Sequence, residues 1–147
     1  MSTEPKEVVF QFLRFMSTGD PEDAEKAGAM FTEDAEFWIV GSLPMSGTVR
    51  GREEILEKRI RPGSRLTVPG SKRLQIGSAI AEGDYVAVEW KSQREVAGMP
   101  DYQNEFFGLF RVEGDKIALL REYMDTQSVK DSRWRENQPN LIQKAGS

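Results

Sequence analysis

Glu122 is the residue of this sequence whose surroundings best suit it to chemistry, and it lies in the segment KIALLREYMD at residues 116–125. The composition of this segment is typical of a β-strand. Because residues two apart share a face of a strand, Glu122 is expected to point the same way as Leu120 and Met124. A carboxylate between two large apolar side chains must be paired, be hydrated or take up a proton. Glu122 is therefore a candidate general acid or base in an apolar pocket, and a structural ion pair is the alternative interpretation.

Histidine and cysteine are both absent from the 147 residues, and this excludes several kinds of catalytic site. The chain has no Ser–His or Cys–His nucleophile system, no disulfide, and no imidazole or thiolate ligand for a metal ion. Acid–base chemistry near neutral pH must then use a carboxylate or lysine of shifted pKa, a tyrosine or bound water. No motif supports a nicotinamide, flavin or metal, so we expect no cofactor.

The charge of the chain argues against nucleic acid as a partner. The formal net charge is -4, and no basic stripe offsets the acidic residues. The sequence has neither a signal-peptide pattern nor an apolar run of membrane-spanning length, so we expect no membrane association and a cytoplasmic protein. One group of basic residues is expected to be a solvated surface: Lys58, Arg59, Arg61, Arg65, Lys72 and Arg73.

The first half of the chain has the periodicity of helices. Val9, Phe12, Leu13 and Met16 follow the i, i+3, i+4, i+7 spacing of an amphipathic helix. The elements expected here are a helix at about 3–19, a second from Asp20 and Pro21 to about 31, a strand at 36–40, a loop at 41–47, and a third helix from 52 to about 60 that Pro62 and Gly63 close.

From about residue 65 onward the pattern changes to strands separated by short turns. Helices followed by consecutive hairpins indicate an α+β fold, with the helices on one face of an antiparallel sheet. The length suits a single domain over residues 1–147, with a polar tail at about 128–147. The expected strands lie at about 72–80, 84–95, 102–112 and 116–124.

Three segments resemble the NTF2-like superfamily, in particular its SnoaL-like and ketosteroid-isomerase-like group. They are MFTEDAEFW at 30–38, LPMSGTVRGREEI at 43–55, and FFGLFRVEGDKI at 106–117 continuing into REYMD at 121–125. With the first helix, the resemblance spans roughly residues 5–127. It implies a cone, in which a strongly curved, mostly antiparallel sheet wraps around N-terminal helices and leaves a hydrophobic pocket. It also implies a homodimer formed through the outer face of the sheet.

The ketosteroid isomerases of this group use an Asp base, and a Tyr and a protonated Asp as the oxyanion hole. The resemblance aligns these residues with Trp38, Phe12 and Phe107 of this sequence. All three are apolar, so the resemblance does not extend to that chemistry.

Limonene-epoxide-hydrolase-like enzymes, which the chain resembles in part, use an Arg between two Asp, and a Tyr and an Asn that help to hold the attacking water. The resemblance aligns Glu89, Lys91 and Glu122 with the charged positions, and Phe37 and Ile39 with the water-holding pair. It implies that Glu122, Glu89 and Lys91 are the catalytic residues, with the charges rearranged and the water-holding pair lost.

The strand expected at 84–95 leaves two interpretations open. Its even positions Val86, Val88 and Trp90 are apolar and its odd positions are polar. Either the even face forms the core and the odd face meets water, or the odd face lines the pocket and a partner subunit covers the even face. The second interpretation adds Gln93, with Glu89 and Lys91, to a pocket expected to form if Glu122 faces the cone. The full expected lining is Leu13, Met16, Phe37, Ile39, Gln93, Asn104, Phe106, Leu120 and Met124.

These residues predict a cofactor-independent acid–base enzyme acting on a small lipophilic molecule, by isomerisation, cyclisation, dehydration or epoxide hydrolysis. The alternative is a non-catalytic domain that binds a small hydrophobic ligand or only dimerises. An interaction scaffold is the weakest interpretation, because no sequence feature marks a peptide groove.

Overall fold

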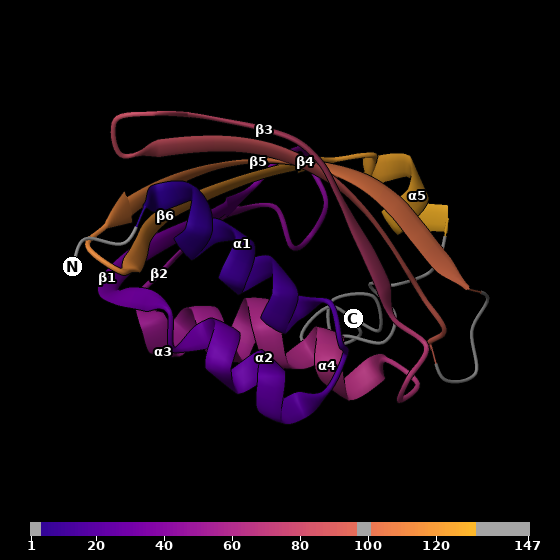
Figure 1. The fold of residues 1–147 in the computed structure, drawn as a ribbon. Helices are drawn as coiled ribbons and strands as arrows, with labels where there is room; N and C mark the ends of the chain where they lie inside the picture. Colours follow the sequence, from indigo (N-terminus) through magenta and orange to yellow (C-terminus); the bar gives the residue numbers. More distant parts are fainter. Residues whose placement is uncertain (1–3, 97–100, 132–147) are drawn as a thin grey trace.

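The computed structural model describes residues 4–96 and 101–131, and it has two layers, a curved sheet and a set of helices under its concave face (Figure 1). The sheet has six strands in the order β2-β1-β6-β5-β4-β3, and neighbours are antiparallel except for the parallel pair β1 and β6. This confirms the predicted α+β cone. The strands are β1 (Phe31–Ile39), β2 (Gly47–Arg50), β3 (Arg73–Glu82), β4 (Tyr85–Arg94), β5 (Tyr102–Glu113) and β6 (Lys116–Met124).

The helical layer is built from short segments. Its first helix, α1, follows the predicted pattern, because Val8, Val9, Phe12 and Leu13 form one buried stripe that faces the sheet. Among the described residues, no helix is long and apolar enough to cross a bilayer. The helices are α1 (Pro5–Met16), α2 (Pro21–Gly28), α3 (Arg52–Ile55), the π-helical turn η1 (Leu56–Ile60), α4 (Arg61–Leu66) and α5 (Thr126–Asp131).

Three predicted boundaries were wrong. The second helix ends at Gly28, and β1 begins at Phe31, five residues before its predicted start. The strand β2, which was not predicted, begins at Gly47, the last residue of the predicted loop. The third helix does not stop at Pro62 but continues through η1 and α4 to Leu66. Proline is tolerated there because it lies in the first turn of α4, where its missing N–H has no helical partner to lose.

The predicted polar tail, at about 128–147, overlaps the last described helix. Residues 126–131 form α5, whose Val129 is 1% exposed and packs with Val96 and Tyr102. The remainder of that prediction, residues 132–147, lies outside the described residues.

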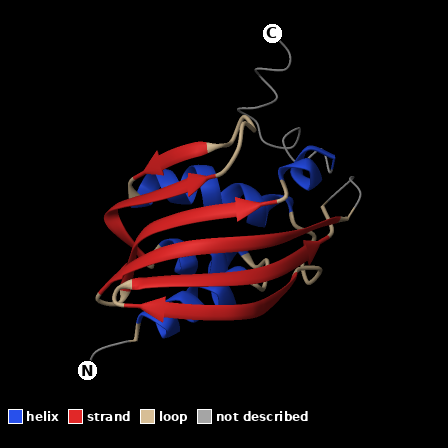
Figure 2. Cartoon of the chain, turned by 90° about the horizontal axis from the view of Figure 1, so that it is seen from above, coloured by secondary structure: helices blue, strands red, loops and turns tan. Residues whose placement is uncertain are grey.

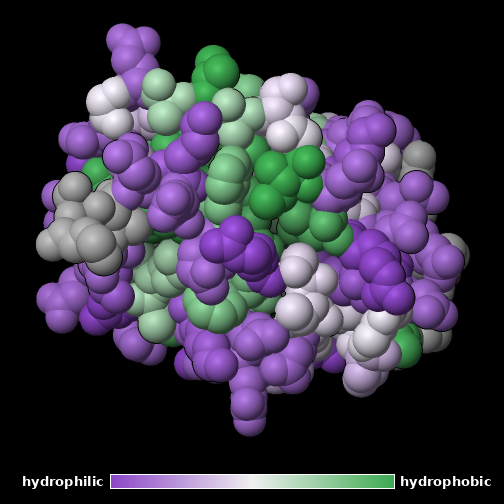
Figure 3. Space-filling view, in the orientation of Figure 1, coloured by the Kyte–Doolittle hydropathy of each residue, from purple (hydrophilic) through white to green (hydrophobic). Residues whose placement is uncertain are grey.

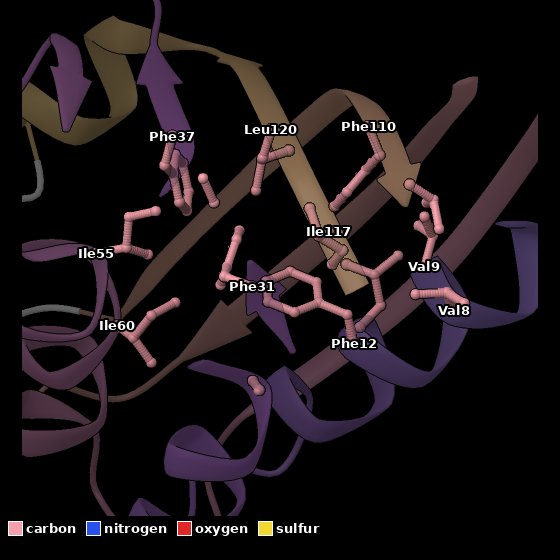
Figure 4. Close-up of a cluster of buried hydrophobic side chains, with 14 of the residues drawn as sticks. Val8, Val9, Phe12, Phe31, Phe37, Ile55, Ile60, Phe110, Ile117 and Leu120 are labelled. Carbon is pink, nitrogen blue, oxygen red and sulfur yellow. The ribbon is translucent and has the colours of Figure 1, made fainter. Parts of the chain in front are cut away.

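A cluster of buried apolar side chains fills the closed end of the cone (Figure 4). Phe12 contacts Phe31 edge-to-face at 5.4 Å between ring centroids and Phe110 at 5.9 Å. Leu120 from β6 and Ile60 from η1 point into the same cluster. The core therefore joins α1, η1 and the sheet, and it fixes where the helical layer lies against the strands.

Gly108 in β5 lets two aromatic rings lie directly over the strand. Trp90 and Phe106 stack with centroids 5.3 Å apart and ring planes 7° from parallel. A Cβ atom on Gly108 would lie 2.8 Å from Trp90 Cζ3 and 2.8 Å from Phe110 Cε1. The concave face at this point is thus packed against glycine backbone, and no larger residue fits without moving the rings.

Gly108→Ala is accordingly expected to destabilise the fold by about 1–3 kcal/mol, because the added methyl overpacks the layer beneath Trp90. Urea unfolding followed by Trp fluorescence measures the change. Glu105→Ala, on the exposed face of the same strand, is the control and is expected to change stability by less than about 0.5 kcal/mol. A Gly108→Ala protein as stable as wild type would contradict this packing.

Candidate active site

A cavity of about 120 Å³ lies between the concave face of the sheet and the helices. Its walls are largely apolar, with Leu13 and Met16 from α1, Phe37 and Ile39 from β1, and Phe106 from β5. On the face seen in Figure 3, hydrophobic residues gather near the middle, over the region of α1 and the β3–β4 side of the sheet, and hydrophilic residues surround them. The cavity therefore has the form of a small-molecule site, an apolar hollow with few polar groups.

Glu122 is the central polar group of this cavity. Its backbone position is fixed on both sides, because β6 pairs it with Ile39 of β1 and with Gly108 of β5. The carboxylate forms no hydrogen bond or ion pair within bonding distance of any residue that the structure describes. Burial among the apolar walls raises the pKa of Glu122 to about 7, although the nearby cations Arg59, Lys72 and Arg94 act to lower it.

Lys72 enters the cavity from the segment just before β3. Its side chain is 9% exposed, although lysine normally keeps its ammonium group in water. The pKa of Lys72 is lowered to about 7, mainly by burial and also by the nearby charge of Arg94, while the charge of Glu122 opposes the change. A lysine and a carboxyl group that both titrate near neutrality thus face the same cavity.

Two arginines complete the set of cations. Arg59 of η1 donates from Nη2 to the carbonyl oxygen of Gly47 at 2.9 Å and lies over the ring of Phe37, 5.6 Å from its centroid. Arg94 of β4 donates from Nη1 to the hydroxyl of Thr67 at 3.4 Å and lies over the ring of Tyr102. Burial lowers the pKa of both guanidinium groups, and the charge of Glu122 opposes that shift.

Tyr102 supplies a hydroxyl group to the cavity, and burial raises its pKa. Asn104 holds this hydroxyl by donating from Nδ2 to the Tyr102 oxygen at 2.8 Å and to the carbonyl oxygen of Asp125 at 3.0 Å. Asn104 was predicted to line the pocket, but it does not border this cavity. It is a buried residue that holds the lining residue Tyr102 in position.

Three further site predictions were wrong because they placed the odd face of β4 in the pocket. Glu89, Lys91 and Gln93 lie exposed on the outer face of the sheet, and Lys91 Nζ is 3.4 Å from Glu105 there. The even face of β4 is buried instead, since its apolar residues belong to the core. The interpretation in which the even face of β4 forms the core and the odd face meets water is therefore the correct one.

The remaining predicted lining residues lie where expected, with one exception. Leu120 shares the inward face with Glu122 but is fully buried in the core below the cavity. Of the residues aligned with ketosteroid isomerases, Trp38 and Phe107 lie on the outer face and Phe12 lies in the core. The predicted residues that the structure brings to the cavity are Leu13, Met16, Phe37, Ile39, Phe106, Glu122 and Met124.

The sequence patterns did not identify the three cations of the site. Arg59 and Lys72 were placed with the solvated basic surface, and Arg94 received no role. One signal was available: Arg94 occupies an even position of β4, in phase with Trp90, and Lys72 is in phase with Leu74. No group of three acidic, His or Cys residues that could hold a metal ion occurs among the described residues.

The SnoaL-like domain family matches residues 9–120, so the chain belongs to this family. No curated protein matches the sequence. An NTF2-like protein from Anabaena variabilis is 25% identical, with a TM-score of 0.71 over 85% of this chain and 95% of that chain. An LEH-like epoxide hydrolase from M. tuberculosis is 22% identical, with a TM-score of 0.69 over 89% and 90%. A protein with a ketosteroid isomerase-like fold from Catenulispora acidiphila, in complex with trimethylamine, is 21% identical, with a TM-score of 0.68 over 86% and 91%.

Lys72→Met is expected to stabilise the fold by about 1–3 kcal/mol near pH 6, because it removes a buried charge from an apolar cavity. The folded-state pKa of about 7 lies below the ordinary 10.5. The burial penalty is therefore full below about pH 7 and disappears as the pH rises toward about 10.5, so the stabilisation should shrink over that range.

Urea unfolding at several pH values between about 6 and 10 measures this effect. Lys91→Met is the matched control, since Lys91 is an exposed lysine of the outer face, and it should change stability by less than about 0.5 kcal/mol throughout. Equal effects of the two variants at the lowest pH would contradict the burial of Lys72.

Proposed function

We propose that this protein is a cofactor-independent acid–base enzyme that moves a proton on a small, largely apolar molecule bound in the cavity. The observation that carries the proposal is Glu122, a carboxylate in an apolar wall with no bonding partner among the described residues and a pKa of about 7. A group half-protonated near neutral pH serves equally as proton donor and acceptor, which is the condition for efficient general acid–base catalysis.

The surrounding charges favour one class of reaction within this proposal. Glu122 removes a proton from the carbon next to a carbonyl group, and the electron pair of that C–H bond moves to the carbonyl oxygen. Arg59 and Arg94 stabilise the negative oxygen that forms, because cations preorganised in a site of low polarity act strongly on developing charge. Return of the proton from Glu122 to a different carbon completes an isomerisation.

Epoxide hydrolysis is less well supported, although a solved structure with the same fold is an epoxide hydrolase. That reaction needs an attacking water held by polar side chains. Phe37 and Ile39, which the resemblance aligns with the water-holding residues, are apolar walls of this cavity.

A ligand-binding protein without turnover is the second candidate, and the same two apolar residues favour it. The cavity would then enclose a small ligand and release it unchanged. Tight binding of a ligand that is recovered intact, with no product from any related compound, would support this function over catalysis.

The test is incubation of the purified protein with a panel of unsaturated ketones and lipophilic epoxides, followed by mass spectrometry and chromatographic separation of isomers. Glu122→Gln is expected to lower kcat/KM by at least about 100-fold, because the amide cannot transfer a proton. The wild-type pH profile should show an apparent pKa near 7, and the variant should lack it. Glu89→Gln, on the outer face, is the control and should leave turnover unchanged; retained turnover in Glu122→Gln would contradict the assigned role.

We also propose that the protein forms a homodimer through the outer face of the sheet, which Figure 2 shows from above with the helices behind it. An aromatic patch supports this. Trp38 contacts Tyr123 at 5.1 Å between centroids, and Phe107 contacts Tyr123 at 6.3 Å. Phe107 and Tyr123 remain 44% and 37% exposed in the single chain, so a second copy would bury them.

Phe107→Glu is expected to shift the protein from dimer to monomer, because it would bury a charge at the centre of the interface. Size-exclusion chromatography with light scattering measures the mass over a range of concentrations. Glu89→Gln, also exposed on this face but polar already, is expected to remain dimeric. A wild-type protein that stays monomeric at high concentration would contradict the proposal.

A further inference from the structure

The charges inside the cavity do not balance. Arg59 and Arg94 each contribute a fixed positive charge, Lys72 adds a third when protonated, and Glu122 is the one acidic group that opposes them among the described interior lining residues. The net charge of these four described groups is therefore positive in every protonation state of Lys72 and Glu122. The other two charged lining residues, Asp20 and Lys58, are exposed to solvent, and Lys58 pairs with Glu54 at 2.9 Å. The ionisable groups among the described residues that line the cavity are Asp20, Lys58, Arg59, Lys72, Arg94, Tyr102 and Glu122.

Arg59, one of these positive groups, lacks a full set of hydrogen-bond acceptors within the described part of the chain. Its Nε is buried and has no hydrogen-bond partner among the described residues, and its one hydrogen bond there runs from Nη2 to Gly47. A guanidinium group has five N–H donors in a fixed planar fork, and leaving such donors buried without acceptors is costly. A buried donor of this kind needs an acceptor, and a ligand bound in the cavity is able to bring one.

The volume of the cavity limits the size of that ligand. The cavity measures about 120 Å³, and an apolar cavity of about 150 Å³ in another protein accommodates benzene. Three aromatic side chains, Phe37, Trp90 and Phe106, are among the residues that line the space. The body of the ligand should therefore be about one ring in size.

From this arrangement we infer that the molecule bound by the cavity is an apolar, ring-sized carboxylic acid whose carboxylate pairs with the guanidinium group of Arg59. A carboxylate suits the site because its two oxygens match the planar fork of an arginine, and such charge-assisted pairs are the stronger hydrogen bonds in proteins. This deepens the proposed function by naming its substrate class, and it rests on that function only for the statement that the acid is then converted. With Arg59 paired to the carboxylate, Arg94 is the guanidinium group that stabilises the oxygen on which negative charge develops.

The bound carboxylate also acts on the proton-transfer groups. A new negative charge near Glu122 and Lys72 favours the protonated form of each, so both pKa values rise on binding. Binding is then coupled to proton uptake. The affinity should increase as the pH falls through about 7 and decrease as it rises above that value, because the protons must be taken from solution.

Isothermal titration calorimetry of the full chain with hydrocinnamate and hydrocinnamamide tests the inference, since the two probes share one body and differ in charge. The acid is expected to bind at least about tenfold more tightly than the amide. Arg59→Gln should remove this preference, while Arg65→Gln, an exposed arginine of the next helix, should retain it. Circular dichroism and thermal unfolding confirm that each variant is folded.

Glu122→Gln provides a second, opposite readout. Removing a negative charge from the cavity should tighten binding of the acid above about pH 7 and flatten its pH dependence, which a merely misfolded site would not do. Equal affinity for acid and amide, or an unchanged preference in Arg59→Gln, would overturn the inference. Neither probe has to react, so those outcomes would not contradict the proposed catalysis. Conversely, if no turnover were found with any substrate, the result of the binding experiment would still hold.

Discussion

The rest of the structure depends on the burial of one carboxylate and three cations beneath an apolar sheet. Each charge would be more stable in water, and the attraction between Glu122 and the cations only partly offsets the loss of hydration. The fold must therefore supply this stability elsewhere. It does so through the aromatic and aliphatic core around Phe12 and Leu120, which binds the helical layer firmly to the sheet. Sites of this kind trade stability for function.

The register of three strands determines what surrounds Glu122. Parallel pairing with β1 places Ile39 on one side, and antiparallel pairing with β5 places Gly108 on the other. Neither neighbour offers a hydrogen bond from its side chain, so the carboxylate faces the cavity without a local partner. A shift of one residue in β6 would turn Glu122 to the outer face and bring Arg121 or Tyr123 inward. The direction of Glu122 into the cavity is thus a property of strand pairing as much as of composition.

Local patterns predicted the parts of this molecule whose burial follows a short period. The stripe of α1, the four long strands and the inward direction of Glu122 all came from residues a few positions apart. The cations could not be found in this way, because Arg59, Lys72 and Arg94 belong to separate elements and each resembles an ordinary surface charge. For Glu89 and Lys91, the alternation of apolar and polar residues in β4 indicated the outer face, which is correct, whereas the resemblance to limonene-epoxide-hydrolase-like enzymes indicated the pocket. The π-turn before Pro62 depends on packing between distant elements, which the sequence does not display.

The shifted pKa values of Glu122 and Lys72 bear on the choice between an enzyme and a binding protein. Burial moves both pKa values toward neutrality, so the protonation of each group responds to a charge that enters the cavity. A protein that only stores a ligand gains nothing from these two groups and loses stability by burying them. Storage of an anionic ligand would need only the arginines, which remain charged at all relevant pH values. A carboxyl group able to gain or lose its proton with little change in free energy is instead what a reaction that moves a proton requires.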